Sequence, residues 1–150
     1  MIKNLRMAVV FLLTAVAPAA AIASSPISGR WYSEGVEHDA YFQFFDEYHD
    51  DGTFTLEGRE IRGCKPGRPW TESGEWTYAN GVLLKWTKIV AGRAVPDTEE
   101  YHDKFVVAVG DGDHQQWLDA KTKVTWSVSH VSPEFRFPVP APCATTRLPQ

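Results

Sequence analysis

The sequence lacks most features that would indicate catalysis or nucleic-acid binding. Its 150 residues contain only two cysteines, no Cys-x-x-Cys pair, no Gly-x-Ser-x-Gly nucleophile motif and no glycine-rich phosphate loop. Three basic residues never follow one another, and the formal charge is -4, which argues against a broad nucleic-acid surface. An enzyme is therefore the less favoured class. No catalytic residue, metal site or cofactor is predicted.

One long apolar run is present, and it lies at the beginning of the chain. Two basic residues precede an apolar stretch from Met7 to Ala17, and the small residues 19–23 follow. This order is typical of a secretory signal peptide, with cleavage predicted before Ser24. An uncleaved membrane anchor is the alternative, but Pro18 keeps the run shorter than the ~20 residues of a spanning helix. We expect residues 1–23 to be removed, leaving a periplasmic or secreted protein with no membrane insertion after cleavage.

Export changes the interpretation of charge and of the cysteines. The segment 1–23 contains two charged residues, both basic, so the mature chain keeps 13 of the 15 basic residues against all 19 acidic ones, a formal charge of -6. Cys64 and Cys143 would lie in an oxidising compartment, where two cysteines most simply form one disulfide. A buried free pair and intermolecular pairing are the alternatives.

The rest of the chain has the pattern of an all-β protein. No segment between Gly29 and His130 keeps a 3.6-residue apolar period, and short runs of β-branched and aromatic residues alternate with turn signals. The break in the apolar face after Leu56 predicts a bulge or bend near Gly58. Eight strands are predicted, over residues 31–36, 40–47, 53–57, 74–78, 82–90, 100–109, 115–118 and 122–130.

The number and order of these strands favour a closed barrel. Short connections such as Asp51-Gly52 and Asn80-Gly81 indicate an up-and-down order, and eight antiparallel strands can close around a filled interior or one small ligand. A β-sandwich is the structural alternative. Prolines at positions 133, 138, 140 and 142 exclude a central strand in the last 20 residues. Residues 132–150 are therefore predicted to form a strap outside the barrel of residues 24–131, fastened at Cys143.

Four short motifs resemble those of the lipocalin-like, or broader calycin, β-barrels. Gly29-Arg30-Trp31 is similar to the family's G-x-W signature, which implies that Trp31 plugs the closed end of the barrel. Three further motifs, DGTF at 51–54, GEW at 74–76 and NGVL at 80–83, resemble in order and spacing those of small bacterial exported members. The resemblance covers about residues 27–131, and a disulfide from the C-terminal segment to the barrel is a habit of the family. Arg136 is the nearest counterpart of the arginine that packs on the plug tryptophan in that family.

In a barrel, the alternation places a mostly aromatic set of side chains inward. The set is Phe42, Phe44, Phe54, Leu56, Trp76, Tyr78, Leu84, Trp86, Tyr101, Phe105, Val107, Trp126 and Val128. Pockets for small molecules are typically apolar and aromatic with a few polar groups. We therefore expect a small apolar or aromatic ligand; a completely filled interior is the alternative. The predicted ligand-binding residues are Tyr78, Trp86, Tyr101, Phe105, Trp126 and His130.

A protein-binding role is the alternative function. An inhibitor or immunity-type protein would act on an exported enzyme through loops at the barrel rim. The surfaces expected for this role are the loop from Cys64 to Thr71 and the acidic loop from Asp46 to Asp51. We interpret the carboxylates around His49 as a solvated turn rather than a metal site.

Overall fold

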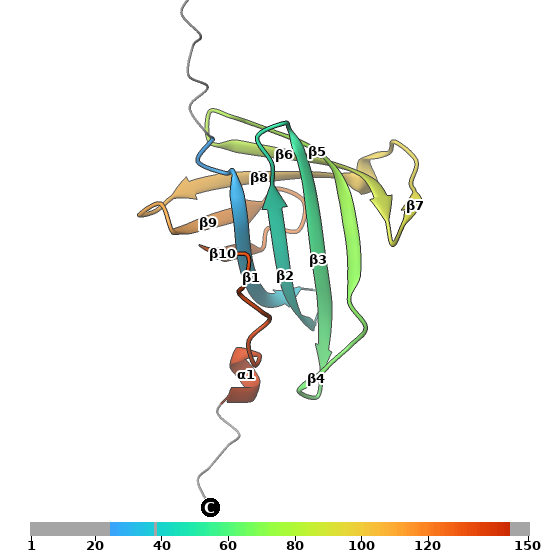
Figure 1. Ribbon diagram of the computed structural model, residues 1–150, viewed down its shortest axis with the longest axis vertical. Coiled ribbons are helices and arrows are strands. Elements are labelled where there is room, and N and C mark those ends of the chain that lie inside the picture. The colour runs from blue at the N-terminus through green and yellow to red at the C-terminus, as the bar shows by residue number, and fades with distance from the viewer. Residues whose placement is uncertain (1–24, 38, 145–150) are drawn as a thin grey trace, which may run out of the picture.

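The computed structural model describes residues 25–37 and 39–144 (Figure 1). The predicted signal peptide, residues 1–23, and its cleavage position lie outside these residues, as do residues 145–150 of the predicted strap. Within the described part of the chain, no helix is long and apolar enough to cross a membrane. The long strands are β1 (Gly29–Glu37), β2 (Ala40–Tyr48), β3 (Thr53–Arg62), β5 (Trp70–Ala79), β6 (Val82–Val90), β8 (His102–Val109), β9 (His114–Asp119) and β10 (Thr125–His130).

These eight strands form a closed antiparallel barrel in up-and-down order. Each long strand pairs with the next one along the chain, and β1 pairs with β10 to close the sheet. The short strands β4 (Lys65–Pro66) and β7 (Arg93–Ala94) extend β3 and β6, while η1 (Glu99–Tyr101) and α1 (Ala141–Ala144) are single turns of helix. The predicted all-β, eight-stranded antiparallel barrel is confirmed, and the chain does not form the alternative β-sandwich.

Large side chains fill one end of the barrel around Trp31. This tryptophan is 2% exposed, and its Nε1 donates a hydrogen bond of 2.8 Å to the Ile27 carbonyl oxygen. Its ring packs against Trp117 and His130, at centroid distances of 5.7 and 5.2 Å. Arg136 instead donates to carbonyl oxygens of its own segment. Trp31 thus lies at the filled end, where the G-x-W resemblance implies it should, and a histidine rather than an arginine covers it.

The C-terminal segment runs along the outside of the barrel beside β1 and ends in α1 (Figure 1). Arg30 Nη1 donates to the Pro133 carbonyl oxygen at 2.7 Å, and the Phe137 ring packs on Phe45 at 4.2 Å. Cys143 is joined to Cys64, with 5.5 Å between their Cα atoms, so the predicted disulfide is confirmed. The segment therefore shields outward side chains of β1 and β2 from water.

Two strands depart from the prediction around Gly58. β3 continues through Gly58 to Arg62, and β5 begins at Trp70 rather than at Gly74. The indole of Trp70 occupies the space above Gly58, since a Cβ there would lie 2.5 Å from Trp70 Cζ2. The predicted bulge near Gly58 is wrong. The register shifts instead between Ser73 and Gly74, where β5 pairs with β6.

The face of β6 is also the reverse of the prediction. The tight turn at Asn80-Gly81 pairs Tyr78 with Leu83 and Trp76 with Lys85. Residues directly opposite each other in a sheet share a face, so Leu83 and Lys85 follow Trp76 into the interior. The predicted inward positions of Leu84 and Trp86 are therefore wrong.

Trp86 and Tyr101, both predicted to bind the ligand, lie away from the barrel interior. The Trp86 ring lies against His102, with 6.3 Å between their centroids. Tyr101 was expected within a strand over residues 100–109, but it is the last residue of η1, and β8 begins at His102.

Candidate functional site

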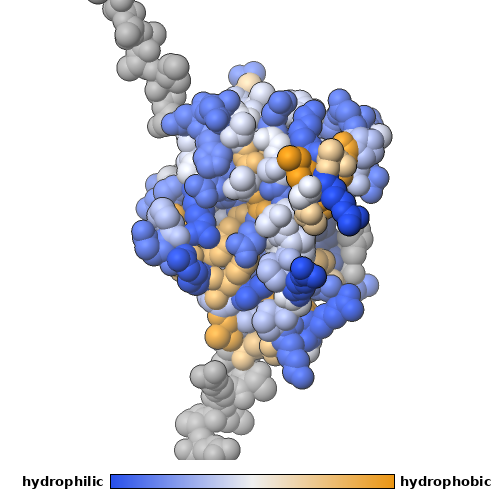
Figure 2. Space-filling view, turned by 45° about the vertical axis from the view of Figure 1, so that its right-hand side comes forward, coloured by the Kyte–Doolittle hydropathy of each residue, from blue (hydrophilic) through white to orange (hydrophobic). Residues whose placement is uncertain are grey.

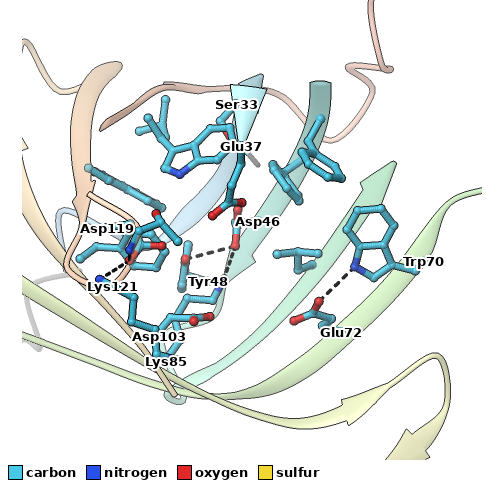
Figure 3. Close-up of a pocket in the computed structure, with 18 of the residues that line it drawn as sticks. Ser33, Glu37, Asp46, Tyr48, Trp70, Glu72, Lys85, Asp103, Asp119 and Lys121 are labelled. Atoms are coloured by element: carbon cyan, nitrogen blue, oxygen red, sulfur yellow. Dashed lines mark hydrogen bonds and ion pairs between the residues drawn. The ribbon is translucent and has the colours of Figure 1, made fainter. Parts of the chain in front are cut away.

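A cavity of about 390 Å³ occupies the barrel on the side away from Trp31 (Figure 3). Its lining draws on all eight long strands, on Glu100 of η1, and on Lys121 and Thr122 of the β9–β10 connection. Small-molecule sites are usually clefts of about 300–1,000 Å³, so this one is large enough for an organic ligand. The alternative of a completely filled interior is wrong, since only the Trp31 end is packed.

Four aromatic rings form one wall of the cavity. Phe42 and Phe44 of β2 stack with their centroids 5.8 Å apart. Trp70 of β5 and Trp126 of β10 meet Phe44 edge-on, at 5.9 and 5.4 Å. Edge-to-face and offset arrangements of this kind are the favoured geometries for aromatic pairs. These four residues, called the ring wall below, hold one another in place and present apolar surface to the cavity.

The floor of the cavity is an ion pair. Lys85 is 3% exposed, and its Nζ lies 2.6 Å from Asp46 Oδ1, which also accepts a hydrogen bond of 3.2 Å from the Tyr48 hydroxyl. The ammonium also lies over the rings of Phe54 and Phe105, at 4.6 and 5.9 Å from their centroids. A buried ammonium needs both a counter-charge and further stabilising contacts, and this one has both.

The charges around Lys85 alter the pKa values of the floor. Burial by itself would lower the pKa of Lys85, but the carboxylates of Asp46 and Asp103 outweigh burial and raise it, so the amine stays protonated. Burial raises the pKa of Asp103; Lys85 and Lys121 oppose this change, and the carboxylates of Asp119 and Asp46 add to it. The surroundings of Asp103 thus disfavour its ionised form.

Acidic side chains outnumber basic ones in the lining. The two basic residues are Lys85 and Lys121. Among the described residues, no group of three or more His, Cys, Asp or Glu side chains is arranged to hold a metal ion. The lining is therefore aromatic and acidic together, whereas the sequence predicted an aromatic lining with only a few polar groups. The six carboxylates are those of Glu37, Asp46, Glu72, Glu100, Asp103 and Asp119.

The structure brings two of the six predicted ligand-binding residues to the cavity, Phe105 and Trp126. Tyr78 packs against the filled core, and His130 covers Trp31 at the opposite end from the cavity. Trp86 lies on the outer face of β6, and Tyr101 in η1 is outside the lining, although its neighbour Glu100 contributes to it.

Three of the acidic lining residues were not predicted, although the alternation of inward and outward side chains along their strands places them inward. Asp46 lies two residues from both Phe44 and Tyr48, Asp103 lies two before Phe105, and Asp119 two after Trp117. Side chains two apart in a strand share a face, so each carboxylate follows an inward aromatic ring into the barrel. The predicted inward set contained only aromatic and aliphatic side chains, so these carboxylates were left out.

The two loops expected for a protein-binding role lie at opposite ends of the barrel. The exposed segment from Cys64 to Pro69 connects β3 and β5 beside the cavity rim. The turn from His49 to Gly52 connects β2 and β3 at the filled end, and Asp46 points into the cavity rather than into this turn. These surfaces therefore do not form one continuous face. On the side shown in Figure 2, the surface is mainly hydrophilic with separate apolar patches.

Comparison with known proteins adds no relative. No protein-family model matches the chain, and no curated protein matches its sequence. The fold is a closed eight-stranded antiparallel barrel, which is compatible with a lipocalin-like architecture. What the cavity does must therefore be argued from its own residues.

The substitution Asp103→Asn is expected to stabilise the protein by roughly 1 kcal/mol at pH 7. The folded-state pKa of Asp103 is raised, so the ionised carboxylate opposes folding at pH values above that pKa, and asparagine removes this cost. The gain should shrink as the pH falls towards 3.8, the ordinary value, because the carboxyl group is then protonated in both the folded and unfolded chains. Urea denaturation of both proteins between pH 4 and pH 8 measures this; a gain that grows on acidification would contradict it.

Proposed function

We propose that this protein is an exported, lipocalin-like binding protein that holds a small aromatic or apolar molecule in the cavity of the barrel. The observation that carries the proposal is a cavity of about 390 Å³ with the ring wall along one side. The G-x-W motif at Trp31 and the up-and-down closure support placement among the calycin barrels. The Cys64–Cys143 disulfide is consistent with an oxidising compartment outside the cytoplasm.

The ring wall suits a planar ligand because its rings adjoin one another: Phe42 and Phe44 stack, and the two tryptophans meet Phe44 edge to face. Phe44 contacts both Trp70 and Trp126, and it thereby joins rings from three strands. A flat ring in the cavity would stack on these side chains and bury apolar surface on both partners. Tryptophans in the lining also give such binding an optical signal.

The test is a fluorescence titration with N-phenylnaphthylamine, a neutral aromatic probe. We expect saturable binding of one probe per chain, with quenching of tryptophan emission, because Trp70, Trp117 and Trp126 line the cavity. The substitution Phe44→Ala should weaken binding about tenfold, since an aromatic contact contributes up to ~1.5 kcal/mol beyond the area it buries.

The matched control is Trp86→Ala, which removes an aromatic ring from the outer face of β6. It should leave the affinity for the probe unchanged. A probe that never saturates, or a loss of affinity as large for Trp86→Ala as for Phe44→Ala, would overturn the proposed function. Recovery of a protein partner from such a non-binding sample would then favour the inhibitor role.

A further inference from the structure

We propose that the molecule held in this cavity is an organic cation, an arylalkylamine in its ammonium form, and not a fatty acid or another anion. The inference rests on the proposed function, because it takes the cavity as the ligand site. It goes beyond that function by assigning the charge of the ligand and the groups that would recognise it.

The first argument is the charge balance of the lining. Six carboxylates face two lysines. Lys85 is committed to Asp46 at 2.6 Å, and Lys121 Nζ donates to the carbonyl oxygens of Glu99 and Glu100. Within the described residues, the ion pair between Lys85 and Asp46 is the one ion pair inside the cavity. The remaining carboxylates leave an excess of negative charge that a cationic ligand would neutralise.

The second argument is that the chain already places an ammonium group in this surrounding. Lys85 Nζ is bound by one carboxylate and lies over the rings of Tyr48, Phe54 and Phe105, at 4.6 to 5.9 Å from their centroids. Aromatic faces attract cations electrostatically, most strongly where water is excluded. The floor of the cavity therefore shows, with a group of the protein itself, which chemistry the lining accommodates.

The third argument is that the same combination recurs above the floor at Glu72, which forms no ion pair among the described residues and interacts with Lys85 only at longer range. Glu72 accepts hydrogen bonds from Trp70 Nε1 at 3.0 Å and from Thr87 Oγ1 at 3.3 Å, which fixes its carboxylate beside the ring wall. These two donors are neutral, so neither supplies a counter-charge to the carboxylate. An ammonium group bound to Glu72 would place an attached aromatic ring against Phe44 and Trp126.

An anionic ligand fits this lining poorly. The buried ammonium of Lys85 is the basic group at the floor, and a ligand carboxylate that bound it would have to share it with Asp46. The ligand would then add a third negative charge beside Asp46 and Asp103, which both already interact with this ammonium. Uncompensated charge in a buried site is costly, so the affinity for carboxylates should be low.

The test compares three probes that share a phenyl ring and a similar length: phenethylammonium, 2-phenylethanol and 3-phenylpropanoate. Each is used at pH 7 to displace N-phenylnaphthylamine from the protein. We expect phenethylammonium to compete roughly tenfold more strongly than the neutral alcohol, the size of a cation–π and carboxylate preference at a partly buried site. The carboxylate should compete less than the alcohol.

Variants separate the charge preference from cavity binding itself. The double variant Glu72→Gln/Asp103→Asn should lower phenethylammonium to the level of the alcohol, while Glu75→Gln, an exposed carboxylate on the same strand, should not change it. Equal competition by all three probes, or a preference that survives the double variant, would overturn the cation inference while the proposed function stands. If N-phenylnaphthylamine itself fails to bind, the proposed function and this inference fall together.

Discussion

Replacing Lys85 with methionine is expected to lower the free energy of unfolding by about 3–5 kcal/mol, the usual loss when one partner of a buried ion pair is removed. The side chains of Lys85 and Asp46 are only 4% and 12% exposed, so Asp46 would remain in the interior without its counter-charge. Asp103 would lose the stronger of the two lysine interactions that oppose its raised pKa. Equilibrium denaturation in guanidinium chloride at pH 7 measures the change.

Two companion variants make this prediction specific. The double variant Lys85→Met/Asp46→Asn should recover most of the lost stability, because it removes the unpaired charge rather than the lysine side chain alone. Lys104→Met, at an exposed position of β8, should unfold within ~0.5 kcal/mol of the unmodified protein. Equal stability of Lys85→Met and the unmodified protein would show that water reaches the floor and screens Asp46.

Removing the disulfide through Cys64→Ala/Cys143→Ala is expected to lower the free energy of unfolding by about 4 kcal/mol, the upper end for a loop of this size in the chain-entropy model. The bridged residues are 79 apart in the sequence, so the bond restricts a large part of the unfolded chain. In the folded protein, the segment that it fastens covers Gln43, which is fully buried and donates to the Pro138 carbonyl oxygen. Thermal unfolding followed by circular dichroism gives the loss.

The control for this prediction is the unmodified protein treated with dithiothreitol, which should unfold at the same temperature as the double variant. Binding of N-phenylnaphthylamine below that temperature should be unchanged in both samples, because the C-terminal segment lies outside the barrel and the cavity inside it. A double variant as stable as the oxidised protein would show that the non-covalent contacts of the segment are sufficient. Loss of probe binding in folded protein would show that the segment shapes the cavity.

The barrel itself could be predicted because its signals are local. Asp51-Gly52 and Asn80-Gly81 mark tight turns, and the alternation on either side defines strands whose number permits closure. The extra length of β3 and β5 could not be obtained in the same way. It depends on Trp70 packing over Gly58, a contact between residues of two different strands that no local pattern shows.

The prediction of which face of β6 points inward was wrong, although the sequence contains the information that corrects it. Trp76 and Tyr78 were placed inward, and a two-residue turn then requires Leu83 and Lys85, their partners in the register, to point inward as well. Apolar character alone favoured Leu84 and Trp86, which led to an interior with too little charge. Strand register, if weighed above hydropathy, would have predicted charged residues in the lining. The excess of carboxylates over lysines could not be predicted in this way, because it depends on the positions of all eight strands.

The closure between β1 and β10 bears on how the chain reaches its folded state. Trp31 pairs with His130, so the first and last long strands of the barrel must meet before any sheet edge is eliminated. Contacts between residues so distant in sequence slow folding, because much chain entropy is lost before they form. A nascent chain therefore cannot complete this seam until the residues of β10, up to His130, have been synthesised, and both edges of the sheet stay open until then.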